Sequence, residues 1–242
     1  MITNSTSESI QYNRFMEEYE YYMTDPDDGE LCLDQFYKYG PLTDQYWSFT
    51  TRILVCNIEP YDQREDLIEV NIDLFKNHWM NRISGYKAQT PRNTAKFIAG
   101  LLMALKNPKV ENIDFRKFDD NELIQSLEKI AYLNFRVNSG KNISAHKNDR
   151  VAEQIKVTGP YIIKQIKILN PQIIIIAGQN NCNIFNSLNP DCKLQFRETK
   201  KWDNKIVCSI EHFSRVDYKN LNKKIAEIIL LFLKEQSTSI EK

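Results

Sequence analysis

The stretch Ile53-Leu54-Val55-Cys56-Asn57-Ile58-Glu59-Pro60-Tyr61-Asp62 decides how this chain is organised. Its first five residues are apolar except for Asn57, and such a run is typical of a buried strand. The strand leads directly into a loop that holds a carboxylate, a proline and an aromatic ring. In an open α/β sheet, ligands bind outside the carboxyl ends of the strands, and a proline restricts the backbone of a turn. The stretch therefore predicts that Glu59 and Tyr61 lie in a stiff loop that is placed for chemistry.

Apolar runs alternate with amphipathic patterns along the rest of the chain. Strands are predicted at 130–134, 172–177 and 206–210, and the segments 193–198 and 205–210, which flank Asp203-Asn204, form either a hairpin or two separate strands. Helices are predicted at 10–23, 63–80, Thr90 to Asn107, 119–129, 149–169 (with a kink or a restart at Gly159-Pro160), 180–188 and 218–235. Strands that alternate with helices favour a parallel sheet with helices on both faces. We therefore expect a three-layer α/β/α fold.

The first fifty residues differ in composition from the rest. The chain has 242 residues, which is enough to bury one core. Residues 1–40 hold nine acidic side chains against two basic ones, a net charge of −7, and they are rich in aromatic residues. So many aromatic residues argue against disorder. We expect residues 1–50 to form an extension packed on the body, and residues 51–242 to form the α/β domain.

The formal net charge of the whole chain is zero, so overall charge gives no argument for nucleic acid binding. Because residues 1–40 carry −7, the remaining residues carry +7. This modest basic surplus permits a phosphate-binding face on the body of the protein without establishing one.

The five cysteines form no C-x-x-C pair, and their number is odd. This pattern indicates reduced thiols in a cytoplasmic protein, and neither a disulfide framework nor a zinc site. The N-terminus lacks the basic start and apolar core of a signal peptide, and no apolar run reaches membrane-spanning length. We expect a cytoplasmic protein with no membrane partner and no metal.

Polar residues follow three of the predicted strands. They are Asn57, Glu59 and Tyr61 after the first strand, Asn134 at the end of the second, and His212 and Ser214 after the last. The carboxyl ends of parallel strands share one edge of a sheet, so these side chains could converge.

These segments resemble the uracil-DNA glycosylase superfamily. Asn57-Ile58-Glu59-Pro60-Tyr61-Asp62 is similar to the family's G-Q-D-P-Y-H motif, Tyr132-Leu133-Asn134 to its strand-ending L-L-L-N, and His212-Phe213-Ser214 to its H-P-S motif. The segment from Pro160 to Gly178 is similar to the P-Y-L-x-x-Q-I-x-x-L-x-P helix and following strand of the iron–sulfur branch. Together the matches cover residues 53–235.

The chain departs from the family pattern at several positions. Glu59 stands where the best-known branch has Asp, Phe213 replaces a proline, and Asn57 replaces a glycine. The cysteines do not match the cluster-binding pattern of the iron–sulfur branch, so we expect no iron–sulfur cluster and no other cofactor. These departures concern the substrate and the catalytic rate more than the fold.

The resemblance implies a four-stranded parallel sheet of order 2-1-3-4 and a monomeric DNA repair enzyme. Such an enzyme flips a pyrimidine, uracil or a modified relative, out of DNA and hydrolyses its N-glycosidic bond. A carboxylate stabilises the cationic sugar and orients water, the role of Glu59, and a neutral histidine donates to the departing base, the role of His212. The remaining candidates are Asn57, Tyr61 and Asn134 for the base, Ser214 and Arg215 for a phosphate, and Val216 or Tyr218 for filling the vacated stack.

Other interpretations of the same residues stay open. His212 could be a structural hydrogen bonder, Glu59 a solvated turn residue, and Asn134 a turn cap. The fold could serve a non-catalytic protein that binds or senses a base, a nucleotide or a partner. It could also serve a hydrolase of a free nucleoside or small nucleotide, which would need no DNA-binding face.

Overall fold

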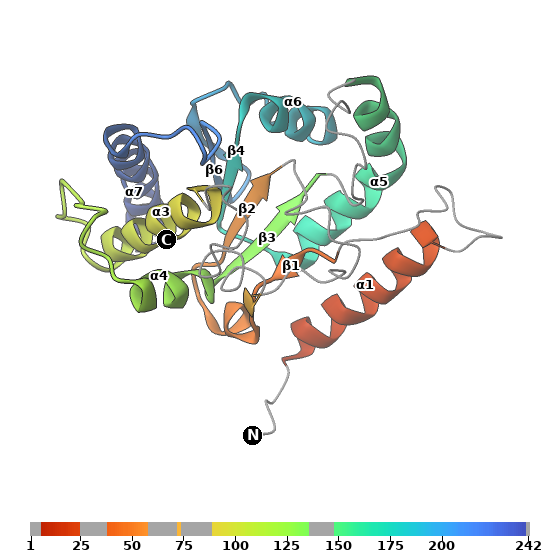
Figure 1. The fold of residues 1–242 in the computed structure, drawn as a ribbon, viewed down its shortest axis with the longest axis horizontal. Helices are drawn as coiled ribbons and strands as arrows, with labels where there is room; N and C mark the ends of the chain where they lie inside the picture. Colours follow the sequence, from red (N-terminus) through yellow and green to blue (C-terminus); the bar gives the residue numbers. More distant parts are fainter. Residues whose placement is uncertain (1–5, 25–37, 58–71, 74–88, 136–147, 241–242) are drawn as a thin grey trace.

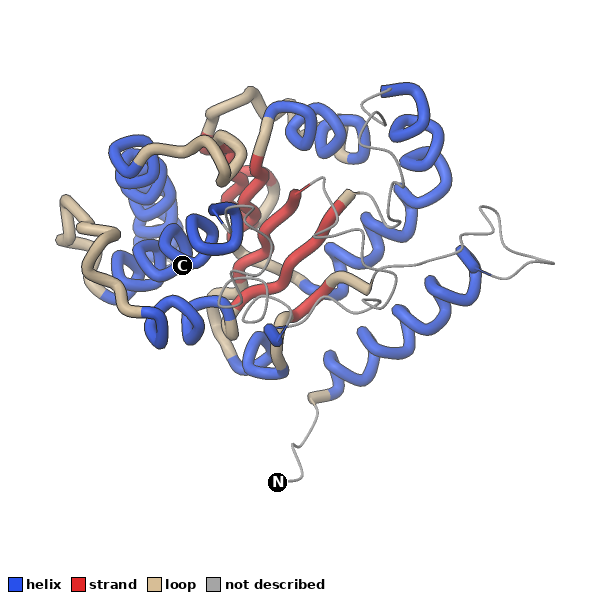
Figure 2. Tube along the Cα trace, viewed as in Figure 1, coloured by secondary structure: helices blue, strands red, loops and turns tan. Residues whose placement is uncertain are grey.

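The computed structural model describes residues 6–24, 38–57, 72–73, 89–135 and 148–240 (Figures 1 and 2). The loop predicted to carry Glu59 and Tyr61 lies outside these residues. So does the helix predicted at 63–80, except that 72–73 are helical.

A six-stranded mixed sheet forms the centre of the fold. Its strands are β1 (Gly40–Pro41), β2 (Ile53–Asn57), β3 (Ile130–Asn134), β4 (Ile173–Ala177), β5 (Thr199–Trp202) and β6 (Lys205–Ile210), in the order β1-β3-β2-β4-β6-β5. The neighbours among β3, β2, β4 and β6 are parallel. The edge strands β1 and β5 pair antiparallel. The sheet thus has two strands more than the four expected, and it is mixed and not wholly parallel.

Helices cover both faces of this sheet (Figure 1). The described helices are α1 (Ser7–Thr24), the 3-10 helix η1 (Asp44–Ser48), α3 (Gln89–Lys106), α4 (Asp120–Leu127), α5 (Asn148–Leu169), α6 (Gln179–Leu188) and α7 (Tyr218–Ile240). Ile53 and Val55 of β2 belong to a core cluster shared with α3, α4 and α7. Leu54 and Cys56 point the other way, into a cluster shared with α1, α5 and α6. This arrangement confirms the α/β class, and it explains why β2, β3 and β4 are fully buried and read as continuous apolar runs.

Helix α1 lies along α5 and is part of the core (Figure 1). Its buried residues are Ser9, Tyr12, Phe15, Met16, Tyr19 and Met23. The hydroxyl of Tyr12 donates to the carbonyl of Tyr39 and accepts from Nε2 of Gln165 on α5, at 2.7 Å. Burial raises the pKa of the Tyr12 phenol, because the charged form would lose its hydration. Tyr12 therefore remains a neutral hydrogen-bonding group between α1, α5 and the segment leading into β1.

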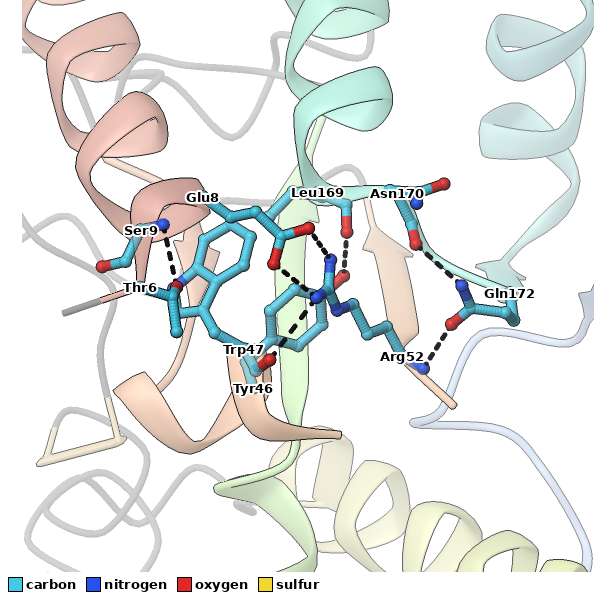
Figure 3. A network of polar contacts seen from close by, with 9 residues as sticks. All are labelled: Thr6, Glu8, Ser9, Tyr46, Trp47, Arg52, Leu169, Asn170 and Gln172. Carbon is cyan, nitrogen blue, oxygen red and sulfur yellow. Dashed lines mark hydrogen bonds and ion pairs between the residues drawn. The ribbon is translucent and has the colours of Figure 1, made fainter. Parts of the chain in front are cut away.

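Arg52 precedes β2 and joins α1 to the amino-terminal end of the sheet (Figure 3). Its guanidinium donates two hydrogen bonds, of 2.8 and 2.6 Å, to the carboxylate of Glu8. Its backbone N–H donates to Oε1 of Gln172, just before β4, at 2.7 Å. The rings of Tyr46 and Trp47 lie 5.9 and 5.5 Å from the guanidinium carbon. This network lies at the end of the sheet opposite the carboxyl ends of β2, β3 and β4.

Two local predictions need correction. The segment 193–198 forms no strand, because Lys193 and Arg197 adopt left-handed φ angles of 48° and 62°, which are incompatible with an extended chain. The hairpin is instead made by β5 and β6 around Asp203, which has φ 54°. Pro160 starts no new helix and lies inside α5.

No helix in the described part of the chain is both long enough and apolar enough to cross a membrane.

Candidate functional site at the carboxyl ends of the strands

Two asparagines end neighbouring strands at the same level. Asn57 is the last residue of β2, Asn134 is the last residue of β3, and the two are paired in the parallel register. They are 2% and 1% exposed, so both carboxamides lie in the interior. Two buried carboxamides at neighbouring strand ends make this end of the sheet a polar site inside an apolar core.

Asn57 is tied to two neighbours. Its Nδ2 donates to the hydroxyl of Tyr132, on β3, at 2.9 Å. Its Oδ1 faces Nδ2 of Asn181, in the first turn of α6, at 3.5 Å. Asn57 therefore links β2 to β3 and to α6, in addition to the base-binding role that the sequence suggests.

Gly178, between β4 and α6, brings a third element to this edge. Its φ of 100° is a conformation that side chains with a Cβ rarely adopt, and its N–H donates to the carbonyl of Ile210, the last residue of β6, at 2.9 Å. A Cβ on Gly178 would lie 3.7 Å from Nδ2 of Asn181 and 3.9 Å from Cβ of His212. His212 therefore lies at the same edge of the sheet as Asn57 and Asn181.

The tautomer of His212 follows from its neighbours. The backbone N–H of Ser214 donates to Nδ1 of His212 at 3.3 Å, and Oγ of Ser214 lies 2.7 Å from the same nitrogen. Because Nδ1 accepts the backbone hydrogen bond, the proton of the neutral imidazole is assigned to Nε2. Nε2 is itself shielded from solvent. His212 is thus arranged as a neutral ring with a buried N–H donor.

The loop after His212 is held by α3. Phe213 is fully buried, its ring centroid lies 6.0 Å from that of Phe97, and its carbonyl accepts from Nδ2 of Asn93 at 2.7 Å. Phe213 therefore anchors the loop by packing. No sequence pattern points to Asn93, since its partner is a backbone carbonyl 120 residues away.

The other predicted phosphate and stacking residues follow Phe213. Ser214 and Arg215 are exposed, and Val216 is half-buried. Tyr218 packs its ring 5.3 Å from that of Phe115 and receives a hydrogen bond from Lys96, so its side chain joins α7 to α3. Glu59 and Tyr61, the carboxylate and the aromatic residue of the first motif, lie outside the described residues.

Four of the five cysteines are described, and all four are buried free thiols. Burial raises the pKa of every one of them, to about 11 for Cys192 and to about 12 for Cys208. The direction is the same for Cys56 and Cys182. These thiols are therefore protonated at neutral pH and poorly suited to act as nucleophiles. Across the described ranges, no group of three or more His, Cys, Asp or Glu side chains could hold a metal ion.

No protein-family model matches the chain, and no curated protein matches it.

Proposed function

We propose that this protein is a uracil-DNA glycosylase-like hydrolase, which flips a pyrimidine out of DNA and cleaves its N-glycosidic bond. The observation that carries the proposal is the arrangement of His212, a neutral imidazole with a buried Nε2 donor, beside buried carboxamides at the carboxyl ends of parallel strands. Donors fixed in advance at a water-poor site stabilise negative charge that develops in a transition state. A departing pyrimidine anion carries such charge on its carbonyl oxygens.

The reaction separates charge in a way that this site suits. As the bond between the sugar C1′ and the base nitrogen breaks, its electron pair moves into the base, and the sugar becomes cationic. Nε2–H of His212 donates to the base carbonyl and keeps its proton. Glu59 stabilises the cationic sugar and orients a water, which attacks C1′ and gives a proton to the carboxylate.

The remaining candidate residues contact different parts of the DNA. Asn134 contacts the edge of the base, and Asn57 and Tyr61 are the other residues assigned to the base. Ser214 and Arg215 are exposed at the start of the loop, where a backbone phosphate could be held. Tyr218 is engaged between α3 and α7, so Val216 is the better candidate for filling the space that the flipped base leaves.

Further observations support the proposal. The inner strands run in the order β3-β2-β4-β6, which is the order that the resemblance implies for the four parallel strands. The buried free thiols suit a reducing compartment, which supports a cytoplasmic location. All the roles above are assigned to residues of one chain. The proposed activity therefore needs no residue from a second copy, which supports a monomer.

The test is base release from oligonucleotides with one uracil, single- and double-stranded, by the full chain under single-turnover conditions. His212→Ala should slow release about 10²–10³-fold, the usual effect of losing one such donor. Glu59→Gln should slow release and leave DNA binding intact, because its charge matters only as the sugar becomes cationic. Lys109→Ala, an exposed change in the turn after α3, is the control.

Three results would contradict the proposal. Wild-type rates in both variants would place the chemistry elsewhere. Binding of a base or of DNA without any release would favour the non-catalytic alternative, and release only from free nucleosides would favour a nucleoside hydrolase.

A further inference from the structure

Asn181 is a buried polar residue that none of the sequence motifs includes. It lies in the first turn of α6 and is 1% exposed. Its Nδ2 donates to the carbonyl of Ala177 and faces Oδ1 of Asn57 at 3.5 Å. Its own Oδ1 is shielded from solvent and has no hydrogen-bond partner among the described residues. A buried carbonyl oxygen that accepts nothing is costly, so its retention calls for an explanation.

The orientation of this amide is fixed by its surroundings. Exchanging the oxygen and nitrogen of Asn181 would bring Oδ1 against the carbonyl oxygen of Ala177, placing two acceptors in contact. It would also bring Oδ1 toward Oδ1 of Asn57. The assigned orientation is the one that pairs the donor with both oxygens, and it leaves the acceptor of Asn181 for another group.

The amide lies within the candidate site. Gly178 contributes no side chain, and the position where its Cβ would stand is bordered by Nδ2 of Asn181 and by Cβ of His212. Asn57, at the end of β2, borders Asn181 on another side. The two side chains that carry the buried acceptor and the buried N–H donor therefore flank the same glycine, from two different elements.

We propose that Asn181 is a specificity-determining residue whose Oδ1 accepts a hydrogen bond from the ring N–H of a base, next to the carbonyl that receives Nε2–H of His212. The ligand class is then a base with an imide or lactam edge, in which a C=O and an N–H are neighbours. This inference rests on the proposed function and narrows its substrate to uracil-type bases. Asn134, at the end of β3, supplies a second carboxamide for the same edge of the base.

The proposed contact distinguishes bases by whether the ring nitrogen that faces Oδ1 of Asn181 is a donor or an acceptor. The N3–H of uracil supplies the donor that Oδ1 of Asn181 lacks. In cytosine the same ring nitrogen is an acceptor, and it would face Oδ1 with two lone pairs opposed. A site built to accept an N–H rejects an analogue without it, because its buried acceptor would again be left unpaired. Asn57 acts here as a positioning residue, since its Oδ1 holds the amide of Asn181.

The experiment measures binding of two free bases and does not depend on cleavage. Dissociation constants of uracil and 3-methyluracil are determined by isothermal titration for the wild-type protein, Asn181→Ala and Asn183→Ala. Methylation of N3 replaces the N–H donor, so the wild type should prefer uracil. In Asn181→Ala the acceptor is gone, and the ratio of the two constants should fall about tenfold. Asn183→Ala changes an exposed asparagine of the same helix and should keep the wild-type ratio.

The outcomes separate this inference from the proposed function. A ratio that is equal in the wild type and in Asn181→Ala overturns the inference, even if DNA cleavage is observed. A reduced ratio supports it, even if no cleavage is found. Absence of uracil binding to the wild type also overturns it. If Asn181→Ala fails to fold, as judged by its melting curve, the comparison is made with Asn181→Leu, which keeps the side-chain volume but has no acceptor.

Discussion

Ser214 directs the proton of His212: its backbone N–H donates to Nδ1 at 3.3 Å, and its Oγ lies 2.7 Å from the same atom. Both contacts come from a residue only two positions further along the chain. They persist as long as the short loop keeps its shape, which the buried Phe213 ensures by packing against α3. Ser214 therefore has a role beyond the phosphate contact that the sequence suggests, because it leaves Nε2 as the donor.

Replacing Ser214 with alanine tests this role. Ser214→Ala removes the hydroxyl and keeps the backbone donor, so part of the tautomer preference remains. We expect single-turnover base release to slow by the equivalent of about 0.5–1.5 kcal/mol, one net hydrogen bond. Ser214→Thr, which restores a hydroxyl, should recover most of the rate, and the α6 variant Ser187→Ala should have no effect. An unchanged rate in Ser214→Ala would mean that the hydroxyl does not contribute to His212.

The parts of the fold that follow from local patterns were predictable. The apolar runs 53–57 and 130–134 correspond to β2 and β3. A strand that is buried on both faces has apolar residues at successive positions, so it can be recognised in the sequence as a continuous apolar run. The edge strand β1, which is only Gly40–Pro41, was missed. The edge strand β5 was expected at 193–198 and lies at Thr199–Trp202, because Lys193 and Arg197 are left-handed and no apolar pattern in the sequence indicates this.

The candidate site was predictable only where side chains follow strands. Asn57, Asn134 and His212 stand at or just beyond strand ends, so their common edge could be inferred. Asn181 lies in the polar run Gln179-Asn180-Asn181, and nothing in that run distinguishes the buried asparagine from its exposed neighbour. Its partners are separated from it in the sequence, so only the folded chain shows its role.

The Glu8–Arg52 pair should make stability depend on pH. Hydrogen bonds from Arg52 hold the pKa of the Glu8 carboxyl below its usual range. A lowered pKa in the folded state stabilises the fold above the unfolded-state value, roughly pH 4.3, and this contribution is lost as pH falls through the folded-state value. The Glu8 side chain is 42% exposed, so we expect Glu8→Gln to cost no more than about 1 kcal/mol at pH 7.

Urea unfolding of the wild type and Glu8→Gln at pH 7 and pH 3 measures this contribution. The difference between the two proteins should shrink at pH 3. Glu18→Gln is the control, since Glu18 and Arg14 are 55% and 81% exposed, and it should change little at either pH. A difference that is as large at pH 3 as at pH 7 would show that the charge of Glu8 is not responsible.

A methyl group at Gly40 should destabilise the junction of α1 with the sheet. A Cβ there would lie 2.6 Å from Cζ of Tyr12, whose hydroxyl is held by Tyr39 and Gln165. Since Tyr12 is buried and cannot swing away without breaking these bonds, we expect Gly40→Ala to cost about 1–3 kcal/mol. Tyr12→Phe, made together with Gly40→Ala, removes the hydroxyl and should relieve part of the cost. Equal unfolding midpoints for the wild type and Gly40→Ala would contradict the clash.

Asn134 should decide which base the proposed enzyme accepts. Its carboxamide, at the end of β3 and 1% exposed, has a donor group that matches O4 of uracil, next to the N3–H assigned to Oδ1 of Asn181. Cytosine offers a donor at N4 in place of this oxygen. Asn134→Asp should therefore abolish uracil release, because an ionised carboxylate has no donor for O4 and repels the developing base anion. If burial keeps the new carboxyl protonated, the preference for uracil over cytosine should weaken, because the carbonyl oxygen of that carboxyl can accept from N4 of cytosine.

Base release from matched oligonucleotides with uracil, thymine or cytosine checks this prediction. The wild type should act on uracil and discriminate against thymine, whose 5-methyl group Tyr61 would crowd. The control is Asn180→Asp, which places the same new carboxyl on an exposed position near the same edge and should keep the wild-type preference. Unchanged uracil release in Asn134→Asp would show that Asn134 does not determine which base is accepted.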